Sequence, residues 1–187
     1  MILYLHGFRS APASHKAQQL RAFMAARGIE GAFNCPQLPV SPREAIMLCD
    51  AVIAASATPV TLVGSSLGGS YATALAERHG LKAVLVNPAV LAHVSLAEHL
   101  GQQTNLFTGE RFEFTRAHIA ELEALEMPRL DAPERYWLMV ESGDEVLDYR
   151  QAVKKYTGAR QTVLAGGDHS FTRWSDYLDD ILEFAGL

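Results

Sequence analysis

The stretch Gly64-Ser65-Ser66-Leu67-Gly68 indicates the fold more strongly than any other part of the chain. It reads G-x-S-x-G, follows an apolar run at 60–63 and precedes a helix-like run at 71–78. Strand, sharp turn and helix in that order form the context in which the central serine becomes a nucleophile. The flanking glycines are needed because the strand and the helix pass too close for a Cβ atom. The motif therefore predicts a strained turn that exposes the Oγ atom of Ser66.

The composition fits a single globular domain. The chain has 187 residues, 49% hydrophobic and 20% charged, and is long enough to bury a sizeable core. The net charge is −5 and no run of lysine or arginine is present, which excludes a nucleic-acid-binding protein. The N-terminus lacks a basic signal-peptide region, and no stretch approaches the roughly 20 apolar residues that span a bilayer. We expect a cytoplasmic protein with no nucleic-acid and no membrane partner.

The two cysteines, Cys35 and Cys49, indicate a reducing compartment in which both are buried thiols. Neither belongs to a CxxC pair or to another spacing typical of metal ligands. We therefore expect no metal site and no cofactor.

Short apolar runs alternate with helix-like segments along most of the chain. The pattern predicts strands at 1–5, 29–35, 59–63, 82–86, 135–140 and 161–164, and helices at 15–27, 42–57, 67–79, 149–156 and 174–184. Such alternation predicts an α/β fold of three layers, with a mostly parallel sheet of about six strands and helices on both faces. In open sheets of this kind, sites lie at the carboxyl ends of the strands.

The alternation breaks between about 90 and 131. This segment is polar and favours helix, with a charged helix near 117–126. We expect the whole chain, 1–187, to be one domain in which this segment, hereafter the insertion, is a lid or cap. Its aromatic residues Phe107, Phe112 and Phe114 are expected to form its own core, with an acyl-binding wall as the alternative.

Two further residues complete the chemistry that a nucleophilic serine needs. A hydroxyl is a poor nucleophile until a base takes its proton, and a histidine base needs a carboxylate to fix its tautomer. In α/β-hydrolases these groups follow the order serine, acid, histidine. Asp144 comes directly after one predicted strand, and His169 comes after the last one. The predicted catalytic residues are therefore Ser66, Asp144 and His169.

Other residues compete for these roles. Ser65 lacks the flanking glycine pattern, Asp148 fits the cap of the next helix, and Asp168 is a sequence neighbour of His169 that more simply stabilises its loop. His6 precedes the nucleophile and fits a structural hydrogen-bonding role.

An oxyanion hole needs two backbone donors, one after the nucleophile and one from the loop that follows the first strand. The predicted donors are the N–H groups of Leu67 and of Phe8 in His6-Gly7-Phe8, with Arg9 a weaker choice than Phe8.

The chain resembles the small bacterial esterases of the YqiA type in the α/β-hydrolase superfamily. The matching pieces are Tyr4-Leu5-His6-Gly7-Phe8, Gly64-Ser65-Ser66-Leu67-Gly68-Gly69, Asn87-Pro88-Ala89-Val90, Gly143-Asp144-Glu145-Val146-Leu147-Asp148-Tyr149-Arg150 and Gly167-Asp168-His169-Ser170-Phe171. The resemblance implies hydrolysis of short acyl esters, with acyl-CoA thioesters as an alternative, by the same three residues. Compared with larger members, the first two strands are missing, which implies the strand order 2-1-3-4-5-6.

Together these features predict a serine esterase that acts on a small-molecule acyl ester through an acyl-enzyme intermediate. An acyl-CoA thioesterase would use the same triad, so the motifs do not separate the two. A non-catalytic ligand-binding protein of the same fold is the alternative from another class, although such a protein has no need of a complete triad.

Overall fold

The computed structural model describes residues 1–187 and is built on one six-stranded parallel sheet. Its strands are β1 (Ile2–Leu5), β2 (Phe33–Asn34), β3 (Thr61–Ser65), β4 (Lys82–Val86), β7 (Tyr136–Glu141) and β8 (Arg160–Leu164). They lie in the order β2-β1-β3-β4-β7-β8, and each neighbouring pair is parallel. Counted within this sheet alone, the order is 2-1-3-4-5-6, so the predicted topology is confirmed.

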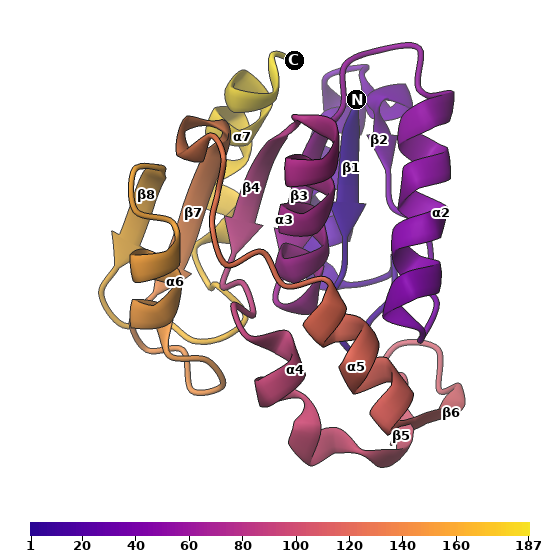
Figure 1. The fold of residues 1–187 in the computed structure, drawn as a ribbon. Coiled ribbons are helices and arrows are strands. Elements are labelled where there is room, and N and C mark those ends of the chain that lie inside the picture. Colours follow the sequence, from indigo (N-terminus) through magenta and orange to yellow (C-terminus); the bar gives the residue numbers. More distant parts are fainter.

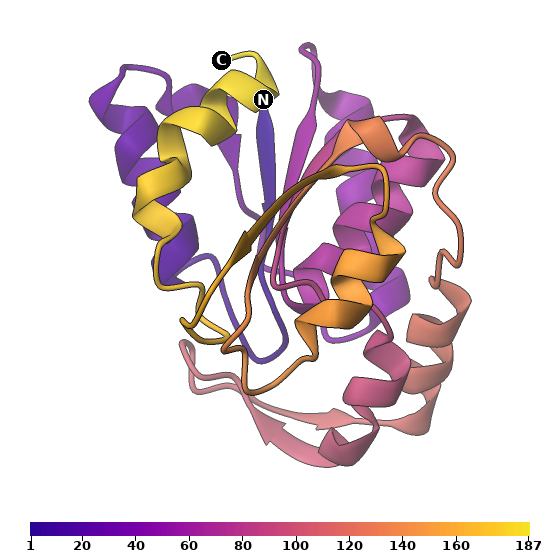
Figure 2. The same cartoon turned by 90° about the vertical axis from the view of Figure 1, so that its left-hand side faces the viewer.

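Helices cover both faces of the sheet, as predicted. Those of the main body are α1 (His15–Ala26), α2 (Pro42–Ala55), α3 (Leu67–His79), α6 (Tyr149–Lys155) and α7 (Leu178–Ala185). Helices α2, α3 and α6 pack on one face, and α1 and α7 pack on the other (Figures 1 and 2). No helix combines the length and the apolar character that crossing a bilayer requires.

The two cores follow from the alternation of side chains along a strand. In β1, Leu3 and Leu5 belong to the core under α2 and α3, whereas Ile2 and Tyr4 belong to the core under α1 and α7. All four side chains are fully or almost fully buried. A strand that buries both faces reads as an uninterrupted apolar run, which is why the sequence showed these strands so clearly.

Several predicted boundaries need correction. The second strand was expected at 29–35, but Glu30–Ala32 forms a 3₁₀ turn and only Phe33–Asn34 pairs with β1. Pro36 follows closely and lacks the N–H needed to continue a ladder. The last helix, predicted as continuous, begins with a separate 3₁₀ turn at Trp174–Tyr177.

The insertion is less helical than predicted. It contains α4 (Ala92–Ser95), a 3₁₀ turn at Ala97–His99, an antiparallel hairpin of β5 (Gly101–Thr104) and β6 (Arg111–Phe114), and α5 (Arg116–Ala124). The hairpin was missed because an Asn105 turn, rather than an apolar pattern, defines it. The Oδ1 atom of Asn105 accepts hydrogen bonds from the N–H groups of Phe107 and Thr108, at 2.9 and 3.0 Å.

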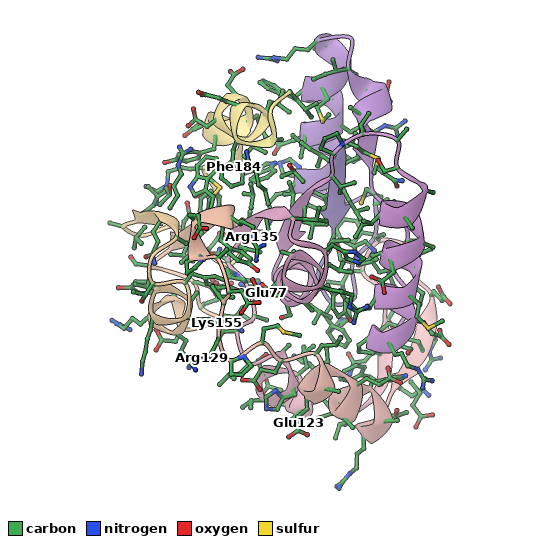
Figure 3. The ribbon with its side chains drawn as sticks, turned by 45° about the horizontal axis from the view of Figure 1, so that its top comes forward. Glu77, Glu123, Arg129, Arg135, Lys155 and Phe184 are labelled. Carbon is green, nitrogen blue, oxygen red and sulfur yellow. The ribbon has the colours of Figure 1, made fainter.

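The insertion lies at the end of the sheet where the strands finish, and both chain termini lie at the opposite end (Figure 1). Its returning end is attached to α3 by Glu77, whose carboxylate accepts hydrogen bonds from the Asp131 N–H at 2.8 Å and from the hydroxyl of Tyr136. Arg135 also approaches this carboxylate, at 3.5 Å (Figure 3). The side chain of Glu77 is only 8% exposed, so these partners compensate its burial.

Candidate active site

Ser66 occupies a strained turn between β3 and α3. Its backbone angles are φ 55° and ψ −120°, outside the regions that non-glycine residues ordinarily adopt. A Cβ atom on Gly68 would overlap the carbonyl oxygen of Leu5, and one on Gly64 would overlap that of Gly68. The strand and the helix therefore approach as closely as the motif requires, and Ser66 lies at the carboxyl end of β3.

His169 connects Ser66 to Asp144. Its Nε2 atom lies 3.0 Å from the Oγ atom of Ser66, and its Nδ1 atom lies 2.8 Å from Oδ2 of Asp144. An ionised carboxylate only accepts hydrogen bonds, so Nδ1–H donates to Asp144. In the neutral ring Nε2 is then free to accept the hydrogen bond of the Ser66 hydroxyl. The structure thus brings together the three residues that the sequence singled out.

Asp144 is held in its ionised form by its partners. Its side chain is 2% exposed, and its Oδ1 atom accepts hydrogen bonds from the N–H groups of Val146 and Leu147, both at 2.9 Å. Burial alone raises the pKa of Asp144, but the hydrogen bonds from His169 and from the two backbone groups outweigh it, so the pKa lies below its usual value.

The competing residues have other partners. Asp148 caps α6 by accepting a hydrogen bond from the Arg150 N–H at 3.0 Å, and Asp168 accepts one from the Ser170 N–H at 2.7 Å. The Nε2 atom of His6 accepts a hydrogen bond from the Leu38 N–H at 3.1 Å, and burial lowers the pKa of His6. None of the three side chains hydrogen-bonds to Ser66 or to the ring of His169.

Of the two predicted oxyanion donors, Leu67 follows Ser66 in the chain, and Phe8 belongs to a loop that approaches Ser66 in space. Leu67 is the first residue of α3, so its N–H group has no partner within the helix. Phe8 follows Gly7, on which a Cβ atom would lie 3.3 Å from the Cβ atom of Ser66. Neither N–H group donates to a carbonyl in a turn, loop or cap.

Sequence reasoning missed Glu141, the last residue of β7, which holds the His169 loop. Its fully buried carboxylate accepts hydrogen bonds from the N–H groups of Asp168 and Thr172, both at 3.0 Å, and from Nε of Arg173 at 2.9 Å. Burial alone raises the pKa of Glu141, but these hydrogen bonds outweigh that effect, so the pKa lies below its usual value. The available signal was a carboxylate at the end of an otherwise apolar strand.

Asn87 was also missed as a site residue. Its Nδ2 atom donates to the carbonyl oxygens of Asp168 and His169, at 3.0 and 3.1 Å, and its Oδ1 atom accepts from the N–H of Glu141 at 3.0 Å. It is buried and has φ 41°, so its backbone is strained as well. Asn87 thus connects the end of β4 to the loops that carry Asp144 and His169.

A cavity of about 350 Å³ opens beside Ser66 and His169. Its walls include the loop 6–10, the start of α1 and the tip of the β5–β6 hairpin, where Leu106 and Phe107 are exposed. No group of three or more His, Cys, Asp or Glu side chains is placed to hold a metal ion. Because Ser66 and His169 both line this cavity, a small molecule in it can reach the Oγ atom of Ser66.

The hairpin is fastened to the loop that carries Phe8. The N–H of Leu106 donates to the carbonyl of Arg9 at 2.8 Å, and Nδ2 of Asn105 donates to that of Ser10 at 2.8 Å. In return, Nε of Arg9 donates to the carbonyl of Thr104 at 3.1 Å.

The three aromatic residues of the insertion have different environments. Phe114 is buried in the core, and Phe112 contacts Phe8 beside a second cavity of about 190 Å³. Phe107 lines the Ser66 cavity. Phe114 thus has the expected core role, and the acyl-binding role of Phe107 stays a prediction.

Solved structures of several other proteins share this architecture. Alpha/beta hydrolase domain-containing protein 10 from mouse is 18% identical, with a TM-score of 0.73 over 97% of this chain and 89% of that one. The monoacylglycerol lipase of Paleococcus ferrophilus is 16% identical, with a TM-score of 0.70 over 98% and 92%. The esterase domain of a Rhodothermus marinus protein is 16% identical, with a TM-score of 0.65 over 98% and 85%.

These likenesses define the chain as a protein of the α/β-hydrolase fold, as the resemblance implied. Residues 1–186 match the model of the family described as Uncharacterised protein family (UPF0227), and the chain belongs to that family.

Proposed function

We propose that the protein is a serine hydrolase of carboxylic esters. One observation carries the proposal: the continuous hydrogen-bonded chain from Ser66 Oγ through His169 to Asp144, with distances of 3.0 and 2.8 Å. This series of hydrogen bonds starts at a strained turn and ends at a buried, ionised carboxylate. The arrangement is the one that activates a serine hydroxyl.

The geometry supports a reaction in two halves. His169 takes the proton of Ser66 as Oγ attacks the acyl carbonyl, and Asp144 stabilises the imidazolium that forms. The N–H groups of Phe8 and Leu67 are the proposed donors to the oxyanion. His169 then protonates the leaving alcohol. In the second half it takes a proton from a water molecule, which attacks the acyl-enzyme and releases the acid. As the acid is released, His169 returns the proton to Oγ of Ser66, which restores the starting state.

The names of the structural neighbours agree with this class, since they include a hydrolase, a lipase and an esterase. We propose a small-molecule acyl ester as the substrate, with short acyl groups because the cavity beside Ser66 measures about 350 Å³. A thioester would pass through the same acyl-enzyme, so kcat/KM for p-nitrophenyl butyrate and for an acyl-CoA, measured side by side, decides between the two substrates.

Labelling with a fluorophosphonate probe tests the proposal. The probe should label the wild type and should fail to label Ser66→Ala. Ser65→Ala is the matched control, because it removes the neighbouring hydroxyl and should still be labelled. A wild type that is not labelled would favour the non-catalytic ligand-binding protein, and labelling that persists in Ser66→Ala would place the nucleophile elsewhere.

A further inference from the structure

The cavity beside Ser66 has a cationic wall. Its lining includes two cations, Arg9 and Lys16, and no aspartate or glutamate. This contrasts with the chain as a whole, whose net charge is −5. A cavity that gathers cations in an acidic protein favours a negatively charged ligand.

Lys16 brings its charge close to the reacting groups. It lies in the first turn of α1, and its Nζ atom donates to the carbonyl of Ser170, the residue after His169, at 2.6 Å. The ammonium group has three donors, so this contact leaves two of them for another partner. No carboxylate lies within 4.0 Å of Nζ. Three carboxylates lie near the ammonium group: Asp144 and Glu141 are paired with His169 and Arg173, and Asp168 accepts a hydrogen bond from the Ser170 N–H.

Arg9 supplies the second charge, from the loop 6–10. Its Nε atom donates to the carbonyl of Thr104, which fixes the guanidinium between the loop 6–10 and the hairpin. Arg9 has no ion-pair partner either, and its two terminal nitrogens make no hydrogen bond within the chain. A guanidinium held in this way can bind a carboxylate or phosphate through two parallel hydrogen bonds.

The amino end of α1 adds to the positive potential of the cavity. Its first turn holds no acidic residue, and the hydroxyl of Ser14, which precedes it and also lines the cavity, is buried without a hydrogen-bond partner. Both features suit an anion, since the amino end of a helix carries partial positive charge.

We infer that the cavity selects esters that carry a negatively charged group, a carboxylate or a phosphate, and that Lys16 and Arg9 bind that group. This inference rests on the proposed ester hydrolysis and names its substrate class. A bound anion would complete the hydrogen bonding of two cations that otherwise have only one protein partner each. The competing explanation is that Lys16 merely supports the His169 loop through Ser170.

Matched substrate pairs separate the two explanations. On the alcohol side, 4-acetoxybenzoate and 4-acetoxyphenyl phosphate are compared with neutral 4-acetoxybenzamide. On the acyl side, mono-4-nitrophenyl adipate is compared with its terminal amide. We expect kcat/KM for at least one anionic ester to exceed that of its neutral partner by about tenfold, the range of a charge-assisted contact, and the excess to shrink as salt is added. The pair that shows the excess tells which anion, on which side, is recognised.

The ratio of kcat/KM for the anionic ester to kcat/KM for its neutral partner is the decisive readout. A displaced His169 lowers both values by the same factor and leaves the ratio unchanged. Lys16→Gln and Arg9→Gln should each reduce the ratio about fivefold or more, and Arg9→Lys, which keeps the charge but loses the two parallel hydrogen bonds, should retain only part of it. Arg21→Gln removes a cation from the same helix outside the cavity, and should leave the ratio unchanged.

Three results would overturn the inference. A wild type that hydrolyses neutral and anionic esters alike has no anion preference, although it is still an esterase. Variants that slow both members of a pair equally would show that Lys16 and Arg9 only support the loops. A wild type that hydrolyses no ester and resists the fluorophosphonate probe would remove the proposed function itself, and the inference with it.

Discussion

Asp144 and Asp148 are four residues apart in one loop, yet their surroundings give them different chemistry. Asp144 is buried against His169 and two backbone N–H groups, whereas Asp148 is exposed and caps a helix. Both could have served as the acid on sequence grounds alone. Substitution by asparagine therefore gives a matched test of the assignment.

We predict that Asp144→Asn lowers kcat for p-nitrophenyl butyrate by about 10³–10⁴-fold, because an amide no longer favours the tautomer in which Nδ1 carries the proton. Asp148→Asn should change kcat less than about threefold, since asparagine can still cap the helix and the side chain does not contact His169. Steady-state kinetics of the two purified variants checks this. Equal damage from both would contradict the assignment of Asp144 as the acid.

The charge of Lys16 gives a pH dependence with a definite sign. Burial lowers the pKa of Lys16 to about 8, although the charges of Asp168, Glu141 and Asp144 oppose part of this effect. The cation is therefore present below about pH 8 and is lost above it. Because kcat/KM reports the ionisation of the free enzyme, the preference for an anionic ester should fall as the pH rises through 8.

Measuring the ratio of kcat/KM for an anionic and a neutral ester between pH 6 and 10 checks this prediction. Lys16→Arg is the control, since a guanidinium keeps its charge throughout this range and should give a flat ratio. A wild-type ratio that does not change with pH would contradict the role of Lys16.

At the scale of elements, the hairpin tip places apolar side chains over the cavity. Leu106 and Phe107 are 68% and 48% exposed, which is costly unless a ligand covers them. We predict that Leu106→Ala with Phe107→Ala lowers the preference for butyrate over acetate esters by about three- to tenfold, because the acyl chain loses apolar contact. Val163→Ala removes an exposed apolar side chain on β8 and serves as the control.

This prediction also tests the expected lid. A panel of p-nitrophenyl esters of increasing acyl length, run on the double variant and on Val163→Ala, gives the comparison. If chain-length preference is the same in both, the insertion does not contribute to substrate selection.

The loop that carries His169 depends on a carboxylate from β7. We predict that Glu141→Gln lowers kcat about 10- to 100-fold and destabilises the fold by about 2–4 kcal/mol, since it leaves Arg173 without its partner and disturbs the bonds to 168–172. Glu77→Gln is the control, because it changes another buried glutamate that is bonded at the far side of α3.

Thermal unfolding and kcat, measured on both variants, separate stability from positioning. Each substitution should lower Tm, but only Glu141→Gln should lower kcat of the folded enzyme. A normal kcat in Glu141→Gln would show that the His169 loop keeps its position without this carboxylate.

At the scale of the whole molecule, the parallel sheet explains how much the sequence could predict. Six strands that end at one edge bring the loops after β3, β7 and β8 together, so Ser66, Asp144 and His169 could be grouped from their places after apolar runs. The sequence shows a carboxylate at the end of β7 and an asparagine after β4, but it does not reveal their roles. Their partners lie in the 168–173 loop, and only the folded sheet brings that loop to them.

The hairpin escaped prediction for a different physical reason. Its strands are half-exposed, and neither β5 (Gly101–Thr104) nor the turn after it carries the apolar alternation of a core strand. The turn depends on Asn105, whose side chain replaces backbone hydrogen bonds. A structure set by one amide group leaves little trace in a hydrophobic pattern.

The two thiols report on the integrity of the whole fold. Cys49 is buried as expected, whereas Cys35 is only partly buried. Burial raises the pKa of Cys35 and Cys49 to about 12, and only the thiolate reacts with alkylating agents. We predict that iodoacetamide at pH 8 modifies the native protein slowly and modifies both thiols once it is denatured. Ala57→Cys, with an exposed thiol, is the control for reagent activity and should react at once, as mass spectrometry would show.

Three hydrogen bonds join the hairpin to the loop 6–10, which carries the proposed oxyanion donor Phe8. A hairpin that swings away must pull on Arg9 and Ser10, and through them on Phe8, the proposed oxyanion donor. Substrate binding and catalysis would then need different conformations, because a displaced Phe8 N–H could not stabilise the oxyanion that forms during attack. The proposed esterase would then be inactive whenever the hairpin is displaced, and it would hydrolyse only a substrate that is bound while the hairpin is in place.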